Sequence, residues 1–465
     1  MVVLYYLIPH RYRWILLLTA SCVFYMWFVP KYILILLVTI LIDFAAGLLM
    51  ERDAGSPKKK KRWMVISIVS TLLVLFIFKY LGFLNDNFVK LCQALGLNVH
   101  TTVKLILPIG LSFHTFQSMS YVIEVYRGHQ KAERHLGYYA LYVMFFPQLV
   151  TGPIERPGNL LRQLHEEKPF QYDNLVRGLR LIIFGFFIKM VVADNLGACV
   201  DAVYEHPEQY NAWSVWLAMA FYSFQIYGDF FGYSTIALGS AQLMGYSISD
   251  NFLSPYLSKN IAEFWHRWHI SLSTWFRDYV YIPLGGSQVK FGRWAYNIMV
   301  VFVLSGIWHG ANWTFLCWGF AHGLLHIVEK VLRKAERTSP QADIEGGIHH
   351  RLIQVLIDIV RVAKTFLFVT LFWVLFRSTD FGNMKAMFTA AFSQFGTGQQ
   401  LSIDPKVWLF LGLFMLSDVV LKDRRFDQWC VKKPVVLRWA IYAVLVFCTI
   451  VFSSVNNFPF IYFQF

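Results

Sequence analysis

Charged residues are scarce in this chain of 465 residues. Asp, Glu, Lys and Arg make up 15% of the sequence, whereas soluble domains contain about 25%. Hydrophobic residues make up 57% and aromatic residues 18%, and the mean hydropathy is +0.47. This composition argues against a soluble globular protein and indicates an integral membrane protein.

Paired cysteines and phosphate-binding motifs are missing as well. The cysteines show no CxxC spacing, and most lie within or beside apolar runs: Cys22, Cys92, Cys199, Cys317, Cys430 and Cys448. Such spacing offers neither a disulfide framework nor a thiol-rich zinc site. The sequence contains no GxxxxGK[ST] and no GxGxxG after a strand, which argues against a nucleotide hydrolase or a Rossmann dehydrogenase.

Long hydrophobic runs, by contrast, recur along the whole chain. About ten to twelve segments approach the length of roughly 20 apolar residues that a helix needs to cross a bilayer. No intervening stretch is large enough to fold as a separate soluble domain. We therefore predict an all-α polytopic membrane protein with a single domain over residues 1–465, in which some segments are re-entrant.

The basic residues follow the topology of a membrane protein. The formal net charge is +14, and the cations cluster between hydrophobic segments at Lys58–Arg62, Arg127–Arg134, Lys330–Arg337 and Lys422–Lys433. The positive-inside rule places these loops in the cytoplasm and predicts no nucleic-acid partner. The spans between them are expected near Trp63–Tyr80, Leu352–Phe376, Val407–Val420 and Trp439–Val451. The outside segments are then Leu81–Thr101, Ser378–Pro405 and Asn456–Phe465.

The stretch Asp250–Trp294 is too polar to span and too aromatic for an ordinary loop. We expect its amphipathic helices to lie at the interface or to line a cavity. If the part Trp265–Leu272 is helical, His266 and His269 share one face, with Glu263 one turn earlier. That spacing permits a metal site.

The metal hypothesis lacks the usual motif. A zincin places its glutamate between two histidines, where this chain has Arg267 and Trp268. His322 and His326 form a second pair four residues apart, which hydrogen-bonded core histidines explain equally. We predict no metal site.

Titratable residues inside apolar segments are candidate site residues, because each carries a desolvation cost. His309 stands between a tryptophan and a glycine in the apolar stretch Ser305–Trp313. Asp229 lies in another apolar stretch, where it could belong to an ion pathway or anchor buried hydrogen bonds. A proton- or ion-coupled transporter therefore stays open, although the chain lacks the paired broken helices of inverted-repeat carriers.

Several motifs, in the same order along the chain, resemble the membrane-bound O-acyltransferases. They are Leu107–Gln117, Phe146–Pro157, Asp229–Gly239, Phe264–Gly286 and Ser305–Gly310, followed by Trp313, Trp318-Gly319 and His322-Gly323. The chain is most similar to the alginate O-acetyltransferase branch, with the D-alanine-exporting teichoic acid branch next. The resemblance also has departures. Relatives carry arginine or asparagine in place of His266, the commoner Asp-Phe-Ser-Gly-Tyr-Ser-Asp run is interrupted at Phe231 and Thr235, and the chain begins about one apolar segment late.

The resemblance implies a helical ring around a funnel or tunnel, with re-entrant and interfacial helices. It assigns the essential histidine of the Trp-His-Gly motif to His309 and the second catalytic-region histidine to His269. We expect the substrate tunnel to be lined by Trp308, Asn312, Trp268, Arg267 and Asp229. Asn312 could donate to an oxyanion or serve as a buried packing residue.

The chemistry of these residues agrees with the implied activity. Acyl transfer to a sugar hydroxyl needs a base, and the reference pKa of histidine near 6.5 suits that task. We expect His309 to be that base, with an acyl-histidine intermediate as the alternative. His269 could orient the donor, stabilise charge or carry a proton.

The predicted function is O-acetylation of an exopolysaccharide such as alginate. The resemblance implies acetyl-coenzyme A as the cytoplasmic donor, with no permanently bound cofactor. It also implies an extracytoplasmic acetyltransferase partner of the SGNH-hydrolase-like type and a location in the bacterial inner membrane. The alternatives are D-alanyl transfer to teichoic acid and transport of protons or ions.

Overall fold

The computed structural model describes residues 1–27, 29–103, 105–149, 152–338, 348–454 and 459–461, without the side chains of 334–338 and 348–350. Within these ranges the chain is helical and contains no strand, only an isolated bridge between Tyr210 and Gln399. The predicted all-α class is confirmed. Of the predicted outside tail Asn456–Phe465, only 459–461 lie within the described residues.

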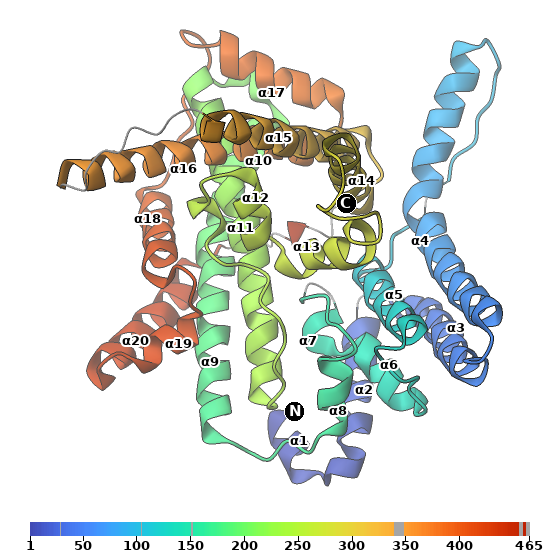
Figure 1. Ribbon diagram of the computed structural model, residues 1–465. Helices are drawn as coiled ribbons and strands as arrows, with labels where there is room; N and C mark the ends of the chain where they lie inside the picture. Colours follow the sequence, from blue (N-terminus) through green and yellow to red (C-terminus); the bar gives the residue numbers. More distant parts are fainter. Residues whose placement is uncertain (28, 104, 150–151, 339–347, 455–458, 462–465) are drawn as a thin grey trace. The chain divides into compact units, whose positions relative to one another are not determined.

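The chain divides into two compact units (Figure 1). Unit 1 comprises Met1–Ile182 and Tyr233–Ser249, and unit 2 comprises Ile183–Gly232 and Asp250–Phe465. The helices α9 (Tyr172–Phe186) and α11 (Ala212–Leu243) contribute residues to both units. That residues 1–465 act as a single membrane domain stays a prediction.

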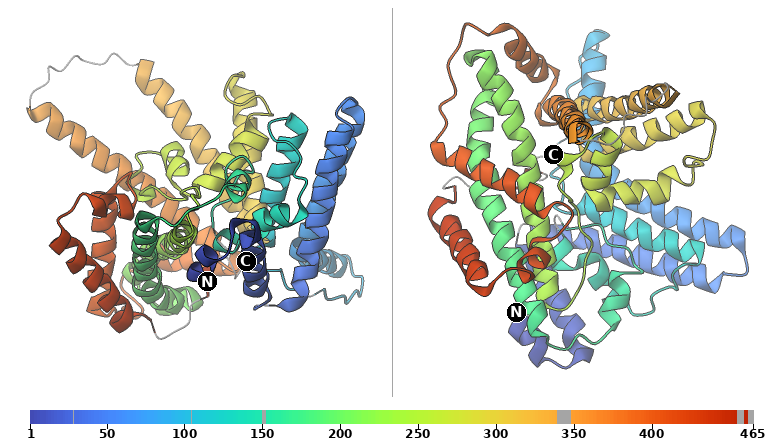
Figure 2. Two further views of the ribbon diagram at one scale, coloured as in Figure 1. Left: turned by 90° about the horizontal axis from the view of Figure 1, so that it is seen from below. Right: turned by 60° about the vertical axis from the view of Figure 1, so that its left-hand side comes forward.

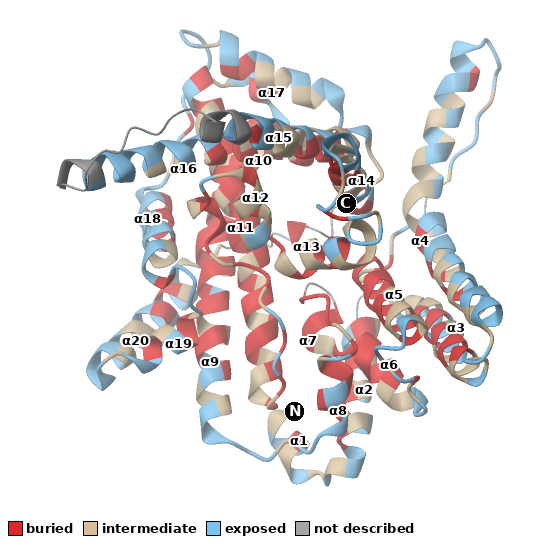
Figure 3. Cartoon of the chain, in the orientation of Figure 1, coloured by how far each residue is buried: buried red, intermediate tan, exposed pale blue. Residues whose placement is uncertain are grey.

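Unit 1 is a bundle of helices. Its helices are α1 (Val2–Leu7), α2 (His10–Met26), α3 (Ile33–Arg52), α4 (Pro57–Ala94), α5 (Leu111–Arg127), α6 (Leu136–Met144), α7 (Phe146–Leu149) and α8 (Leu160–His165). The 3₁₀ turn η1 (Pro30–Tyr32) lies between α2 and α3. α3 packs against α4, and the two stay side by side in both further views (Figure 2). Burial concentrates in α5 and α6, whereas much of α4 is exposed (Figure 3).

A buried carboxylate joins α3 to α4 in unit 1. Asp43 is 1% exposed, and its Oδ1 accepts hydrogen bonds from Ser67 Oγ at 2.5 Å and Thr71 Oγ1 at 3.2 Å. Hydrogen bonds between helices satisfy polar groups that the bilayer cannot hydrate. In this structure Asp43 therefore acts as a link between two helices.

Unit 2 contains the stretch that the sequence marked as polar and aromatic. Its helices are α10 (Asp194–Glu205), α12 (Ile261–Arg267), α13 (Ile270–Phe276), α14 (Phe291–His309), α15 (Trp313–Thr338), α16 (Ile348–Arg377), α17 (Phe381–Ser393), α18 (Pro405–Leu421), α19 (Phe426–Val431) and α20 (Val435–Phe452). It also contains the π-helical segments η2 (Phe187–Ala193) and η5 (Arg277–Tyr281) and the 3₁₀ turns η3 (Pro207–Gln209) and η4 (Pro255–Leu257).

α14 and α15 approach each other closely at two glycines. A Cβ added to Gly306 would lie 3.3 Å from the Cα of Gly319, and nearer still to the carbonyl oxygen of Phe315. Small residues let helix backbones pack tightly where a bilayer supplies no hydrophobic driving force. This contact fixes the end of α14, where His309 lies.

Six helices of the described chain are long and apolar enough to cross a membrane. They cover Pro30–Arg52, Pro57–Ala94, Phe291–His309, Trp313–Arg333, Arg351–Arg377 and Val435–Phe452. Three predicted spans fall within them, whereas the predicted span Val407–Val420 lies in α18, which has only 17 residues. The chain is thus a multi-pass membrane protein, while the funnel stays a prediction.

Candidate active site

His309 is the last residue of α14 and is 5% exposed. Its imidazole meets the ring of Trp318 from α15 edge-on, with centroids 5.0 Å apart, and the ring of Phe376 from α16 at 5.2 Å. Gly310 follows, where an added Cβ would collide with the ring of Phe315. The Trp-His-Gly motif therefore has a steric reason, because only glycine lets Phe315 pack against the turn beside His309.

His269 lies between α12 and α13 in a left-handed backbone conformation, with φ 44° and ψ 55°. Such a conformation is uncommon for a residue other than glycine and costs about 1–2 kcal/mol. Asn251 holds the turn, because its carbonyl oxygen accepts from Ile270 N at 2.9 Å and its Oδ1 accepts from Ser271 Oγ at 2.6 Å. Unusual backbone conformations cluster at functional sites.

The condition for a shared face, one helix over Trp265–Leu272, is not met. α12 ends at Arg267 and α13 begins at Ile270, because His269 leaves the helical region. His266 and His269 therefore do not share a helix face, and the geometry that suggested a metal site is not formed.

Burial sets the protonation state of His269. The side chain is 0% exposed, and burial lowers the pKa of His269 to about 3 because a charged imidazole loses its hydration. Its ring meets the ring of Phe230 from α11 edge-on at a centroid distance of 4.7 Å. At neutral pH His269 is therefore an uncharged imidazole.

One indole lies between the two histidines. The ring centroid of Trp308 is 4.9 Å from that of His309 and 6.3 Å from that of His269. The structure thus brings together three residues that the sequence had singled out, from two elements of unit 2. We call His269, Trp308 and His309 the histidine cluster.

Two other predicted tunnel residues lie on α12 and the turn after it. Trp268 is buried in an aromatic core, 5.5 Å from the ring of Phe264 and 5.0 Å from that of Trp373. Arg267 pairs with Glu263 at 3.1 Å and with Asp423 at 2.5 Å. Their tunnel roles stay predictions.

Asn312 and Asp229 both make structural hydrogen bonds. Asn312 Nδ2 donates to the carbonyl of Thr379 at 2.5 Å, and its Oδ1 accepts from Thr314 N at 3.2 Å near the start of α15. Asp229 Oδ1 lies 2.7 Å from Lys189 Nζ. Asp229 is buried, as the anchor interpretation requires, whereas Asn312 is only partly buried. Their tunnel roles stay predictions.

The second histidine pair lies on α15. His322 is fully buried among aromatic rings, and its Nδ1 accepts from Trp265 Nε1 at 3.4 Å. His326 lines a cavity. In the described part of the chain, no group of three or more His, Cys, Asp or Glu side chains is placed to hold a metal ion.

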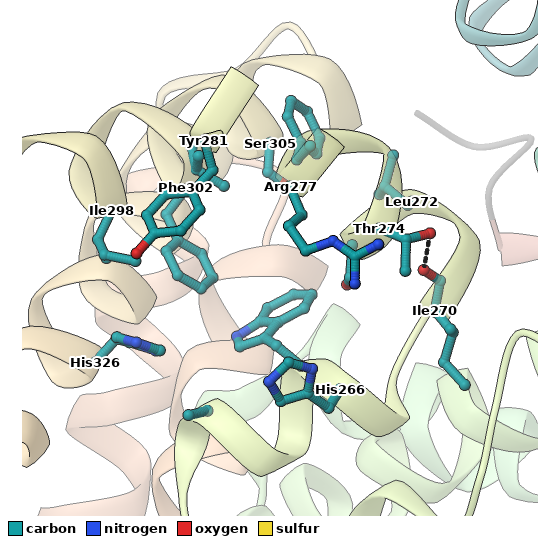
Figure 4. Close-up of a pocket in the computed structure, with 15 residues that line it drawn as sticks. His266, Ile270, Leu272, Thr274, Arg277, Tyr281, Ile298, Phe302, Ser305 and His326 are labelled. Atoms are coloured by element: carbon teal, nitrogen blue, oxygen red, sulfur yellow. Dashed lines mark hydrogen bonds between the residues drawn. The ribbon is translucent and has the colours of Figure 1, made fainter. Parts of the chain in front are cut away.

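A cavity of about 310 Å³ lies in unit 2 between α12, α13, η5, α14 and α15. Its polar lining comprises His266, Ser273, Thr274, Arg277, Tyr281, Ser305 and His326. Figure 4 shows the guanidinium of Arg277 reaching into the space above His266, with His326 to one side. Ser305 is one helical turn before His309 on the same face of α14, so the cavity begins beside the histidine cluster.

Sequence reasoning missed most of this cavity. His266 was set aside because relatives differ there, and Arg277 was not singled out within the stretch Asp250–Trp294. None of the five predicted tunnel residues lines the cavity. The only available signal was the density of polar side chains in Asp250–Trp294.

Comparison with known proteins identifies the family of the chain. The profile of the membrane-bound O-acyltransferase family matches residues 129–360. Probable alginate O-acetylase AlgI of Pseudomonas putida is 34% identical over 99% of this chain and 96% of its own length. Its counterpart in Pseudomonas aeruginosa is 36% identical over 90% and 77%. Peptidoglycan O-acetyltransferase of Helicobacter pylori is 32% identical over 78% and 71%. The chain therefore belongs to the membrane-bound O-acyltransferase family and is a membrane-embedded acyltransferase.

Proposed function

We propose that this chain transfers acetyl groups from cytoplasmic acetyl-coenzyme A to a hydroxyl acceptor, for O-acetylation of an exopolysaccharide such as alginate. The names of the two Pseudomonas relatives support the substrate class. The proposed location is the bacterial inner membrane. An extracytoplasmic partner of the SGNH-hydrolase-like type would deliver the acetyl group to the polymer.

The observation that carries the proposal is the position of His309. Its imidazole lies among aromatic rings at the end of α14, one indole from His269. A ring nitrogen of His309 takes the proton of the acceptor hydroxyl while the oxygen attacks the thioester carbonyl. A C–O bond forms, the C–S bond breaks, and His309 returns the proton to the departing thiolate.

His269 has a different role in the proposal. With a pKa of about 3, its imidazole is a poor proton carrier at neutral pH. A neutral imidazole can still donate its N–H to the oxygen that becomes negative in the transition state. We therefore assign His269 to charge stabilisation at the thioester carbonyl.

The 310 Å³ cavity is the proposed site for the acetylated end of the donor. Ligand sites usually span about 300–1,000 Å³, so this space would hold the thioester arm and leave the nucleotide outside. Arg277 reaches into it, although it also pairs with Asp278 at 2.8 Å. No metal and no permanently bound cofactor take part in the proposed reaction.

Gene replacement in the source bacterium tests this function. A strain that carries His309→Ala should make polymer without acetyl esters, as measured by proton NMR of the purified exopolysaccharide. The control is His206→Ala, whose side chain is 61% exposed. Normal acetylation in the His309→Ala strain, with the protein present in its membranes, would contradict the proposal. Loss of D-alanyl esters instead would identify the teichoic acid reaction, and loss of an ion gradient without ester loss would identify a transporter.

A further inference from the structure

A short segment near the C-terminus, Pro459–Ile461, belongs to unit 2, and its last two residues are buried. Phe460 is 0% exposed and Ile461 is 5% exposed. The contacts of these residues explain their burial.

An ion pair between Asp229 of α11 and Lys189 of η2 holds the backbone of this segment. Asp229 Oδ2 accepts a hydrogen bond from Ile461 N at 2.8 Å. Lys189 Nζ lies 2.7 Å from Asp229 Oδ1 and 2.5 Å from Asp194 Oδ1. These three charged groups are buried, and a buried charge stays in place only when partners surround it. The ion pair thus gives the segment a rigid attachment point.

The next residue on α11 connects the segment to the histidine cluster. The ring of Phe460 packs against the ring of Phe230 at a centroid distance of 5.7 Å. Phe230 in turn meets the imidazole of His269 at 4.7 Å and 87°. Edge-to-face contacts of this kind have a defined geometry. Phe460 therefore packs against Phe230, the ring that contacts the imidazole of His269.

His269 needs such support because its backbone is strained. A left-handed histidine persists only where the surrounding structure fixes it, and Asn251 fixes the turn through Ile270 and Ser271. The imidazole itself is oriented by the rings of Phe230 and Trp308.

We infer that Pro459–Ile461 is a positioning element for His269, with Phe460 and Asp229 as its positioning residues. The inference rests on the proposed acyl transfer, in which His269 contacts the reacting carbonyl. Neither residue touches substrate. Each acts through Phe230, and the attachment of the C-terminal segment becomes a requirement for turnover.

Phe460→Ala tests the inference in membrane vesicles from source cells, which contain the full chain and its partners. Removing the ring frees Phe230, so turnover with radiolabelled acetyl-coenzyme A should fall at least about tenfold, since small misplacements of catalytic groups cost up to about 100-fold. The KM for the donor should not change. Phe460→Leu, which keeps most of the volume, should restore part of the turnover.

A matched control separates positioning from general destabilisation. Phe426 is also buried in unit 2, where its ring stacks on Phe184 at 4.3 Å. Phe426→Ala should lower the melting temperature about as much as Phe460→Ala, but it should leave turnover near the wild-type value. Equal loss of turnover in both variants would overturn the inference.

The conservative pair at Asp229 gives a second test. Asp229→Asn keeps an oxygen that can accept from Ile461 N, whereas Asp229→Ala removes it. Lys189 keeps Asp194 as a partner in both variants. We expect Asp229→Asn to retain most of the turnover and Asp229→Ala to lose it as Phe460→Ala does. If the two variants behave alike, the hydrogen bond to the segment is not what matters.

A labelling experiment works without any enzymatic activity. Diethyl pyrocarbonate modifies accessible neutral histidines, and mass spectrometry locates the label. His269 should be protected in the wild type and in Phe426→Ala, and it should become labelled in Phe460→Ala. Protection in Phe460→Ala would contradict the inference. Because this result does not depend on acetyl transfer, it still decides the matter if wild-type vesicles transfer no acetyl group.

Discussion

Unit 2 contains two buried groups of titratable residues with different surroundings. One group is paired with opposite charges, and the other packs among aromatic rings. Lys189, Asp194 and Asp229 are charged groups at ion-pair distances of 2.5 and 2.7 Å. His269 and His309 lie among aromatic rings. The first arrangement fixes charge in place, whereas burial among aromatic rings keeps His269 uncharged at neutral pH. We infer that the ion group supports structure, and we propose that the histidine cluster supports chemistry.

Breaking the ion group should have the largest effect on stability. Lys189→Met leaves Asp194 and Asp229 buried without their cation, which costs about 3–5 kcal/mol when one partner of a buried pair is removed. The melting temperature of the protein in detergent reports this loss of stability. Lys406→Met is the control, because Lys406 pairs with Asp404 at an exposed site, where a pair contributes at most about 1 kcal/mol. Equal melting temperatures for both variants would refute a stabilising role for the ion group.

Changing the turn beside His309 should reduce activity more than stability. In Gly310→Ala the new methyl group collides with the ring of Phe315 and displaces His309. Acetyl transfer should fall by up to about 100-fold. Gly292→Ala, which places a methyl group in open space on α14, is the control and should keep its activity. An active Gly310→Ala enzyme would show that the position of His309 is not critical.

The smallest predicted effect is a pH dependence from His269. Its folded pKa of about 3 lies below the unfolded value of about 6.5, so the unfolded chain binds a proton between these values and the folded chain does not. The contribution of neutral His269 to the free energy of unfolding is complete above pH 6.5. It is lost as pH falls, at about 1.4 kcal/mol per pH unit. His269→Gln should therefore show a smaller decrease in melting temperature between pH 7 and pH 5 than the wild type. An identical decrease would mean that His269 is hydrated in the folded state.

Much of the fold could be predicted from the sequence, because membrane spans depend on local composition. The spans near Trp63–Tyr80, Leu352–Phe376 and Trp439–Val451 all fall within apolar helices. His309 could also be identified from the sequence as a candidate site residue, since a histidine in an apolar run carries a desolvation cost wherever it lies.

The features that failed or were missed depend on contacts between distant residues. The break at His269 is held by Asn251, and no local propensity identifies that pairing. The insertion of Phe460 against Phe230 joins residues 230 positions apart. Four of the five predicted tunnel residues are sequence neighbours of the two histidines, whereas the cavity is lined by other residues of the same helices.

The central claim is that His309 is the base for acetyl transfer. The most direct measurement is the initial rate of label transfer from radiolabelled acetyl-coenzyme A in membrane vesicles that contain equal amounts of wild-type, His206→Ala or His309→Ala protein. We expect His206→Ala to match the wild type and His309→Ala to be slower by about 10² to 10⁴-fold, the usual contribution of a positioned base. A His309→Ala rate equal to the wild-type rate would contradict it.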